Sequence, residues 1–204
     1  GQDTAPLSVE AKVGDPQEEI TDDLCAMEDV ADVPVVQALS SEDYQLLPDA
    51  KMFIFERLID AGEAEELRSS LRFTPEEVAV HEARLTNERA SGRRITRTSL
   101  RRRMLMPEVA ARVWRRIKSC LPQVLEDDRT LVGVRSQMNY YQYDRAMSFR
   151  THVDGGHRHT DTGSTSVYTF VIYLNDDFHG GATRFCPLPE WQGQPKQVRA
   201  QAGR

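Results

Sequence analysis

The stretch VYTFVIYL, residues 167–174, is a run of eight residues without a charge, rich in β-branched and aromatic side chains. Such residues favour strands, and an apolar run of this length is typical of a strand that is buried on both faces. Turn residues follow it at 175–177 and at Gly180-Gly181, and the chain returns as another β-prone segment at residues 182–186. We therefore expect the C-terminal half of the chain to be built from strands.

Moving outward from this run, the sequence predicts further strands before it. Residues 149–154 read as a short strand, residues 131–143 are β-prone and carry aromatic side chains, and residues 51–55 form an earlier β-like run. The sequence shows no internal repeat.

Three helices are expected between the early run and the strand-rich half. Asp60 with Glu63 and Thr74 with Glu77 each form a capping-box pattern, which predicts helices through residue 71 and to about residue 89. Pro107 opens a third helix, which Pro122 closes, and its apolar face holds Val109, Val113, Trp114 and Ile117. Helices first and strands second indicate an α+β domain, with the helices packed on one face of a β-sandwich or jelly roll.

Charge is distributed unevenly along the 204 residues, although the net charge is only −6. Residues 1–49 hold thirteen acidic side chains and one lysine, whereas residues 84–118 hold eleven arginines, one lysine and two glutamates. We expect residues 1–47 to be an acidic, disordered tail and residues 48–204 to form the domain. The tail is either solvated or folded back on the basic face, and that face could also receive an acidic or nucleic-acid partner. No aromatic side chains alternate with the arginines, so a nucleic-acid partner is the less favoured reading.

The composition excludes several classes of protein. No apolar run approaches the roughly 18 residues that span a bilayer, so we expect no membrane partner. Residues 1–10 have neither a basic start nor an apolar core, so no secretory signal is expected there. The three cysteines, Cys25, Cys120 and Cys186, lack metal-binding spacing and favour a reducing, cytoplasmic location. Cys120, near a helix end, reads as a small apolar filler.

The residues with the clearest chemistry are His152 and Asp154. Side chains two apart in a strand share a face, so an imidazole nitrogen and a carboxylate oxygen could bind one metal ion here. They would form two-thirds of the 2-His-1-carboxylate triad that non-haem Fe(II) oxygenases use. An H-x-D tripeptide alone has little specificity, so its sequence context decides.

That context resembles a known family. The pattern Tyr143-x-x-Ala146-x-x-Phe149-x-x-His152-x-Asp154, followed by TFVIYLNDDFHGGATRF at residues 169–185, resembles the catalytic domain of the prolyl-4-hydroxylase-like Fe(II)/2-oxoglutarate-dependent dioxygenases. The likeness is close over residues 135–185 and looser back to residue 51.

The resemblance implies a double-stranded β-helix, or jelly roll, with iron held at its mouth. His152 and Asp154 match the first two iron ligands, and Tyr143 matches a tyrosine whose hydroxyl contacts the co-substrate. Thr169 and Tyr173 match residues that line the pocket for the far carboxylate of 2-oxoglutarate. The implied cofactors are Fe(II), 2-oxoglutarate as co-substrate and ascorbate as reductant, with O₂ as the oxidant.

The implied reaction hydroxylates a substrate C–H bond while 2-oxoglutarate is decarboxylated to succinate. A peptidyl proline is the leading substrate, and a protein or peptide is therefore the expected partner. Two alternatives stay open: a non-catalytic relative or fragment that acts as a binding module, or an oxygenase that acts on nucleic acid or a small molecule. No further catalytic residue is assigned from the sequence.

The sequence departs from the family pattern in two places. Ala146 stands where the family has glycine, which predicts a differently turned loop. The family's second histidine ligand, and the Lys or Arg that pairs with the far carboxylate, have no counterpart here, so we expect a chain truncated before them and lacking the C-terminal strands. His157 and His159 could approach a metal, but a loop at the pocket mouth is the favoured reading, and His179 and His81 are expected to be ordinary surface residues.

Overall fold

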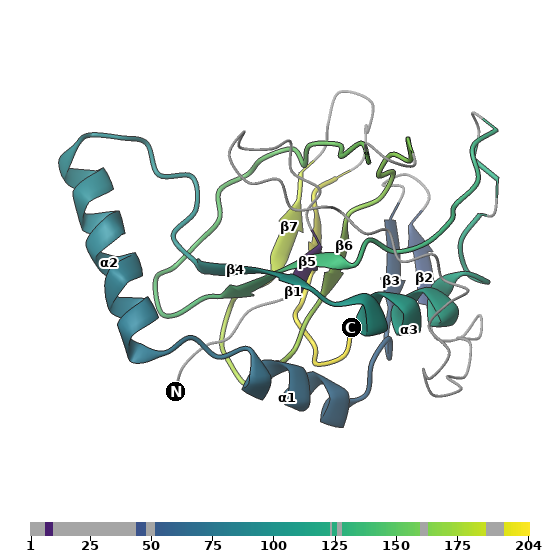
Figure 1. Cartoon of the computed structure of the whole chain (residues 1–204), viewed down its shortest axis with the longest axis horizontal. Coiled ribbons are helices and arrows are strands. Elements are labelled where there is room, and N and C mark those ends of the chain that lie inside the picture. The colour runs from purple at the N-terminus through teal and green to yellow at the C-terminus, as the bar shows by residue number, and fades with distance from the viewer. Residues whose placement is uncertain are drawn as a thin grey trace.

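A computed structural model describes residues 7–9, 44–47, 52–122, 124–125, 128–159, 163–186 and 194–204. Three helices and three antiparallel sheets form in this part of the chain (Figure 1). The helices are α1 (Ala61–Ser70), α2 (Pro75–Ala90) and α3 (Pro107–Ile117). The strands are β1 (Leu7–Val9), β2 (Tyr44–Leu47), β3 (Met52–Phe55), β4 (Leu100–Leu105), β5 (Gln137–Gln142), β6 (Phe170–Ile172), β7 (Thr183–Phe185) and β8 (Lys196–Val198).

The first two helices begin where their capping boxes predict. The Asp60 side chain accepts from the Glu63 backbone N–H at 2.8 Å, and the Glu63 carboxylate accepts from the Asp60 N–H at 3.0 Å. Thr74 and Glu77 make the same reciprocal pair at the start of α2. Each box satisfies backbone donors that the first helical turn leaves without partners, which is why the signal could be read from sequence.

The largest sheet has the strand order β4-β5-β1-β6, and every neighbouring pair in it is antiparallel. β1 lies between β5 and β6, with Leu7 opposite both Tyr140 and Ile172. β2 pairs with β3, and β7 pairs with β8. The two short strands β1 and β2 fall within the segment expected to be a disordered tail, and the remainder of residues 1–47 lies outside the described residues.

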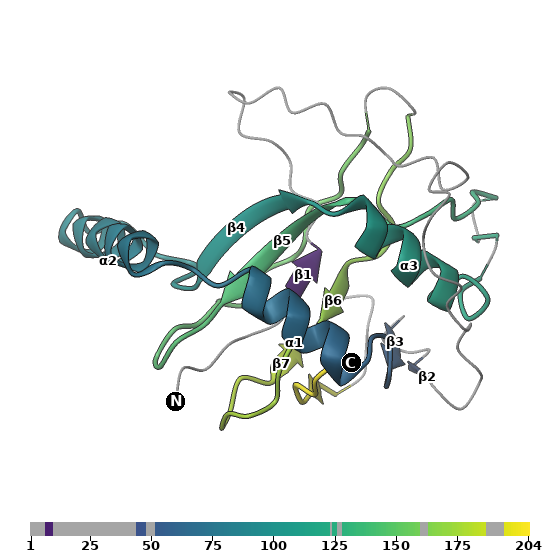
Figure 2. The same cartoon turned by 60° about the horizontal axis from the view of Figure 1, so that its bottom comes forward.

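One face of the large sheet packs on α1 and α3. The main hydrophobic cluster joins Met138, Tyr140 and Ile172 of the sheet to Ala64 of α1 and to Val109, Val113 and Ile117 of α3. Figure 2 shows α1 in front of this sheet and α3 to its right, with α2 standing apart. Cys120 packs against the same cluster, as expected of an apolar filler. The described residues thus combine helices with small antiparallel sheets, and α1 and α3 lie on one face of the largest sheet.

The opposite face of the sheet carries the candidate site. Because side chains alternate along a strand, Asn139 and Tyr141 of β5 point away from the helices, as does Val171 of β6. Beside β6, Val171 and Tyr173 pack against β3, β7 and β8 in a second hydrophobic cluster that includes Val198 and Ala200. The helices thus cover one face, while loops and short strands cover the other.

Several strand predictions were wrong in extent. Residues 150–154 form no strand, because the backbone pairing of this segment is confined to Ser148, Phe149 and Arg150, opposite residues 96–98. The predicted strands at 131–143 and 167–174 shorten to β5 and β6, and the one at 182–186 shortens to β7. β4 was missed, because arginines occupy its outward positions and hide the alternation.

None of the helices in the described residues is both long and apolar enough to cross a bilayer. The double-stranded β-helix stays a prediction.

Candidate metal centre

His152 and Asp154 lie together although the segment that carries them is not a strand. His152 Nε2 is 3.0 Å from Asp154 Oδ1, and about one-third of each side chain is exposed. The intervening Val153 is 72% exposed, while the two polar side chains that flank it meet each other. The expected side-by-side placement is therefore present, without the predicted ladder.

The hydrogen bond at the other ring nitrogen, Nδ1, indicates what must lie between His152 Nε2 and the Asp154 carboxylate. His152 Nδ1 is 2.8 Å from the Arg150 carbonyl oxygen, and because a carbonyl can only accept, Nδ1 carries the proton and donates it. A neutral imidazole then presents a lone pair on Nε2 to a carboxylate oxygen, and two acceptors at 3.0 Å require a cation between them. That cation is either a second proton on the ring or a metal ion.

The separation fits a metal ion. Two ligand atoms about 2.1 Å from one ion and at right angles to each other lie about 3.0 Å apart, and adjacent positions of an octahedron have this angle. Donation from the remote ring nitrogen to a backbone carbonyl is also the usual arrangement around metal-binding histidines. Among the described residues, however, no group of three His, Cys, Asp or Glu side chains could hold an ion. The residues present fit two positions of a metal site.

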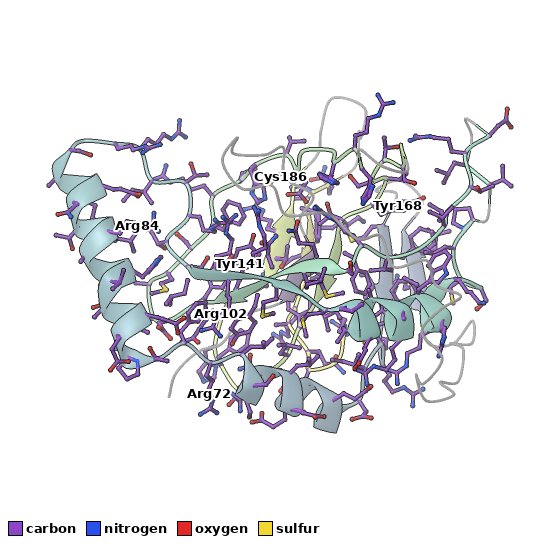
Figure 3. All side chains as sticks on the ribbon, viewed as in Figure 1. Arg72, Arg84, Arg102, Tyr141, Tyr168 and Cys186 are labelled. Atoms are coloured by element: carbon purple, nitrogen blue, oxygen red, sulfur yellow. The ribbon has the colours of Figure 1, made fainter. Side chains whose placement is uncertain are left out.

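An aromatic stack connects this pair to the sheet. The Phe149 ring lies 3.8 Å from the His152 ring, centroid to centroid, with 19° between the planes. The Arg97 guanidinium lies 5.2 Å from the Phe149 centroid and 4.9 Å from the Tyr141 centroid, and it donates a 3.0 Å hydrogen bond to the Tyr141 hydroxyl. Figure 3 shows Tyr141 at the sheet.

Tyr143, the predicted co-substrate contact, continues this chain of side chains. Its ring centroid lies 6.5 Å from that of Tyr141, and the residue is half-buried. The two tyrosines are two apart in sequence, which places them on one face of the strand and its extension. Tyr143 thus stands at the far end of a series of ring contacts that leads through Tyr141, Arg97 and Phe149 to His152, and its contact with a co-substrate stays a prediction.

Thr169 and Tyr173 lie directly before and directly after β6. The buried Tyr173 hydroxyl donates a 2.6 Å hydrogen bond to Thr183 Oγ1 on β7, and burial raises the pKa of this phenol. Thr169 is exposed and precedes β6 by one residue, so the two residues flank the strand that was expected to carry both. Their proposed contact with the co-substrate stays a prediction.

The remaining histidines divide by their surroundings. His159 is buried, and its backbone pairs with Ser164 and Gly163, while the His157 backbone pairs with Ser166. His179 is exposed, as expected. His81 is more than an ordinary surface residue, because its Nε2 donates a 2.8 Å hydrogen bond to the Thr98 carbonyl and so ties α2 to the segment before β4.

The loop before His152 explains one departure from the family pattern. Ala146 has a φ of 65°, in the left-handed region that glycine adopts without steric cost. Ala146 thus holds a backbone conformation that favours glycine, and a loop turned differently from that of the family stays a prediction. Arg150 and Arg184 are exposed.

Comparisons of the chain with protein-family models, with curated proteins and with solved structures find no match. The residues and their geometry are therefore the basis of the functional argument. Sequence reasoning missed Arg97 and Tyr141, which are 44 residues apart, because a stack across two distant segments leaves no local pattern.

Proposed function

We propose that this chain is the iron-binding part of an Fe(II)/2-oxoglutarate-dependent oxygenase, with His152 and Asp154 as two metal ligands. The observation that carries the proposal is the 3.0 Å separation of Nε2 and Oδ1, with Nδ1 already committed to a backbone carbonyl. This donor set, one imidazole and one carboxylate in adjacent positions, is the one that facial-triad iron sites use. The proposal assigns two ligands and leaves the third open.

The bound iron, with 2-oxoglutarate and O₂, would supply the oxidation that hydroxylates a substrate C–H bond and yields succinate and CO₂, with ascorbate keeping the metal reduced. The chain's own residues would hold the ion and orient the groups around it. His152 and Asp154 fix the ion, and Tyr143 offers a hydroxyl on the same side of the sheet. Phe149 covers one face of the imidazole and keeps water from it. The proposed substrate is a peptidyl proline, in line with the family resemblance.

The test is an anaerobic titration of the purified chain with Fe(II) and 2-oxoglutarate, followed by the weak visible metal-to-ligand charge-transfer band. The band should form in the parent and be lost in His152→Ala and in Asp154→Ala. His179→Ala is the matched control, because His179 is exposed in a turn, and it should keep the band. A parent chain that forms no band, or a band that survives both ligand substitutions, would refute the assignment.

A second candidate is a metal-binding module without turnover. It is favoured by one observation, that no third His, Cys, Asp or Glu joins the pair within the described residues. Both candidates predict the charge-transfer band, but the oxygenase alone produces succinate from 2-oxoglutarate in the presence of O₂. Succinate measured with and without proline-containing peptides separates the two.

A further inference from the structure

The imidazole of His152 is held from two sides although its side chain is one-third exposed. The Arg150 carbonyl accepts its Nδ1 proton, and the Phe149 ring lies almost parallel to it at 3.8 Å. An exposed histidine without such contacts samples several rotamers, each of which points Nε2 in a different direction. The hydrogen bond and the stack together select the orientation in which Nε2 faces Asp154.

Phe149 is in turn fixed by a segment remote in sequence. Its backbone forms a bridge with that of Arg97, and the flanking pairs are Thr98 N–H to the Ser148 carbonyl and Arg150 N–H to the Thr96 carbonyl, both at 2.9 Å. The Thr98 hydroxyl also accepts from the Ser148 N–H at 2.7 Å. The same pairing therefore places both groups that orient His152, the Phe149 ring and the Arg150 carbonyl.

The Arg97 side chain completes the stack. Its guanidinium lies within cation–π range of Phe149 and of Tyr141, and its hydrogen bond to the Tyr141 hydroxyl anchors it to β5. A planar guanidinium held against both rings limits the rotation of Phe149. The order Tyr141, Arg97, Phe149, His152 thus runs without a break from the sheet to the candidate ligand.

We propose that Phe149 and Arg97 are positioning residues that set the plane of the His152 imidazole for metal binding. The inference rests on the proposed function, since that function is what gives the orientation its use. Phe149 is half-buried and belongs to neither hydrophobic cluster of the described residues, so the core does not depend on it. Its contacts are with His152 and Arg97, which is the arrangement expected of a residue that acts through a ligand.

The first measurement is a titration of the full chain with Co(II), a redox-stable probe, followed by its visible absorption. Phe149→Leu should bind Co(II) about 10-fold more weakly, the low end of the range for residues that hold a metal ligand, because a leucine fills space without a flat surface. Phe149→Tyr keeps the ring and should stay within about 2-fold of the parent. Arg97→Gln should fall between the two, because the ring remains but its second contact is lost.

Phe185→Leu is the matched control. Phe185 is also a half-buried phenylalanine, but it packs in the second hydrophobic cluster. Its substitution should lower the stability of the fold and leave Co(II) affinity unchanged. Equal Co(II) affinity in Phe149→Leu and the parent would overturn the inference.

The second measurement needs no metal. The imidazole C–H protons of His152, assigned by their loss in His152→Ala, should resonate upfield in the parent, because they lie over the Phe149 ring. Phe149→Leu should remove that shift, and Phe149→Tyr should retain it. If the parent binds no Co(II), the proposed function fails, but this NMR comparison still tests whether Phe149 stacks on His152 and orients it. An unchanged His152 spectrum in Phe149→Leu would overturn the inference.

Discussion

Gly203 is a position at which a single methyl group should disturb the fold strongly. The Gly203 carbonyl accepts hydrogen bonds from the Leu58 and Ile59 N–H groups at 2.8 and 3.2 Å, and its own N–H donates to the Tyr173 carbonyl at 2.8 Å. Its φ is +81°, and a Cβ added here would lie 2.1 Å from the Ile59 carbonyl oxygen. The residue thus ties the end of the described chain to the segment before α1 and to the end of β6.

The cost of Gly203→Ala has two parts. The left-handed conformation costs an alanine about 1–2 kcal/mol. The contact with Ile59 cannot be relieved by a side-chain rotation, because both atoms belong to or adjoin the backbone. The two segments must therefore separate and weaken hydrogen bonds worth about 1 kcal/mol each. We expect a loss of about 3–4 kcal/mol in the free energy of unfolding, or roughly 10 °C in Tm for a domain of this size.

Gly92→Ala is the control that isolates the steric part. Gly92 has a similar φ of +69°, but a Cβ there would meet nothing within 4 Å. It should lose only the conformational cost of about 1–2 kcal/mol. Urea unfolding followed by tryptophan fluorescence measures both variants, since Trp114 packs against the main core. Equal stabilities for the two variants would show that Gly203 is not enclosed between Ile59 and Tyr173.

Three further outcomes follow from local features. Ala146→Gly should raise stability by about 0.5–1 kcal/mol, because φ there is 65°, and a loss of stability in urea would contradict this. Tyr140→Phe should leave stability unchanged or raise it, because the buried Tyr140 hydroxyl has no hydrogen-bond partner in the described part of the chain. Tyr141→Phe should cost about 1 kcal/mol, because it removes the hydrogen bond from Arg97. The reverse order of stability in the urea assay would refute both assignments. The pKa of Glu77 is lowered below its ordinary 4.5, first by a hydrogen bond from the Thr74 N–H, so the contribution of this carboxylate to stability is present above pH 4.5 and lost as pH falls below that value. Glu77→Gln should flatten this part of the stability–pH profile. A profile unchanged from the parent would count against the cap.

Local signals were sufficient for the helices. The capping boxes at Asp60 and Thr74 and the proline at 107 marked the helix starts correctly, because a cap satisfies backbone donors within four residues of itself. The strands were predicted less well. β4 was missed because Arg101 and Arg103 occupy its exposed positions. Residues 149–154 were predicted to be a strand, although no neighbour in the described part of the chain continues the pairing beyond Arg150.

The pairing of strands depends on partner strands that are distant in the sequence and leave no local pattern in it. Leu7 lies opposite Tyr140 and Ile172, positions more than a hundred residues along the chain. A strand is stable only where its hydrogen bonds are completed by a neighbour, so composition alone predicts the tendency and overestimates the length. The same reason explains why β6 spans three residues of an eight-residue apolar run.

The sequence by itself predicted that the His152 and Asp154 side chains lie together. His152 and Asp154 are two residues apart, and that spacing turns both side chains to one side in any extended backbone, strand or not. Only the tertiary structure decided how the imidazole is oriented. Its hydrogen bond to the Arg150 carbonyl and its stack on Phe149 depend on pairing with residues 96–98, and that pairing exists because two segments some fifty residues apart meet beside the sheet.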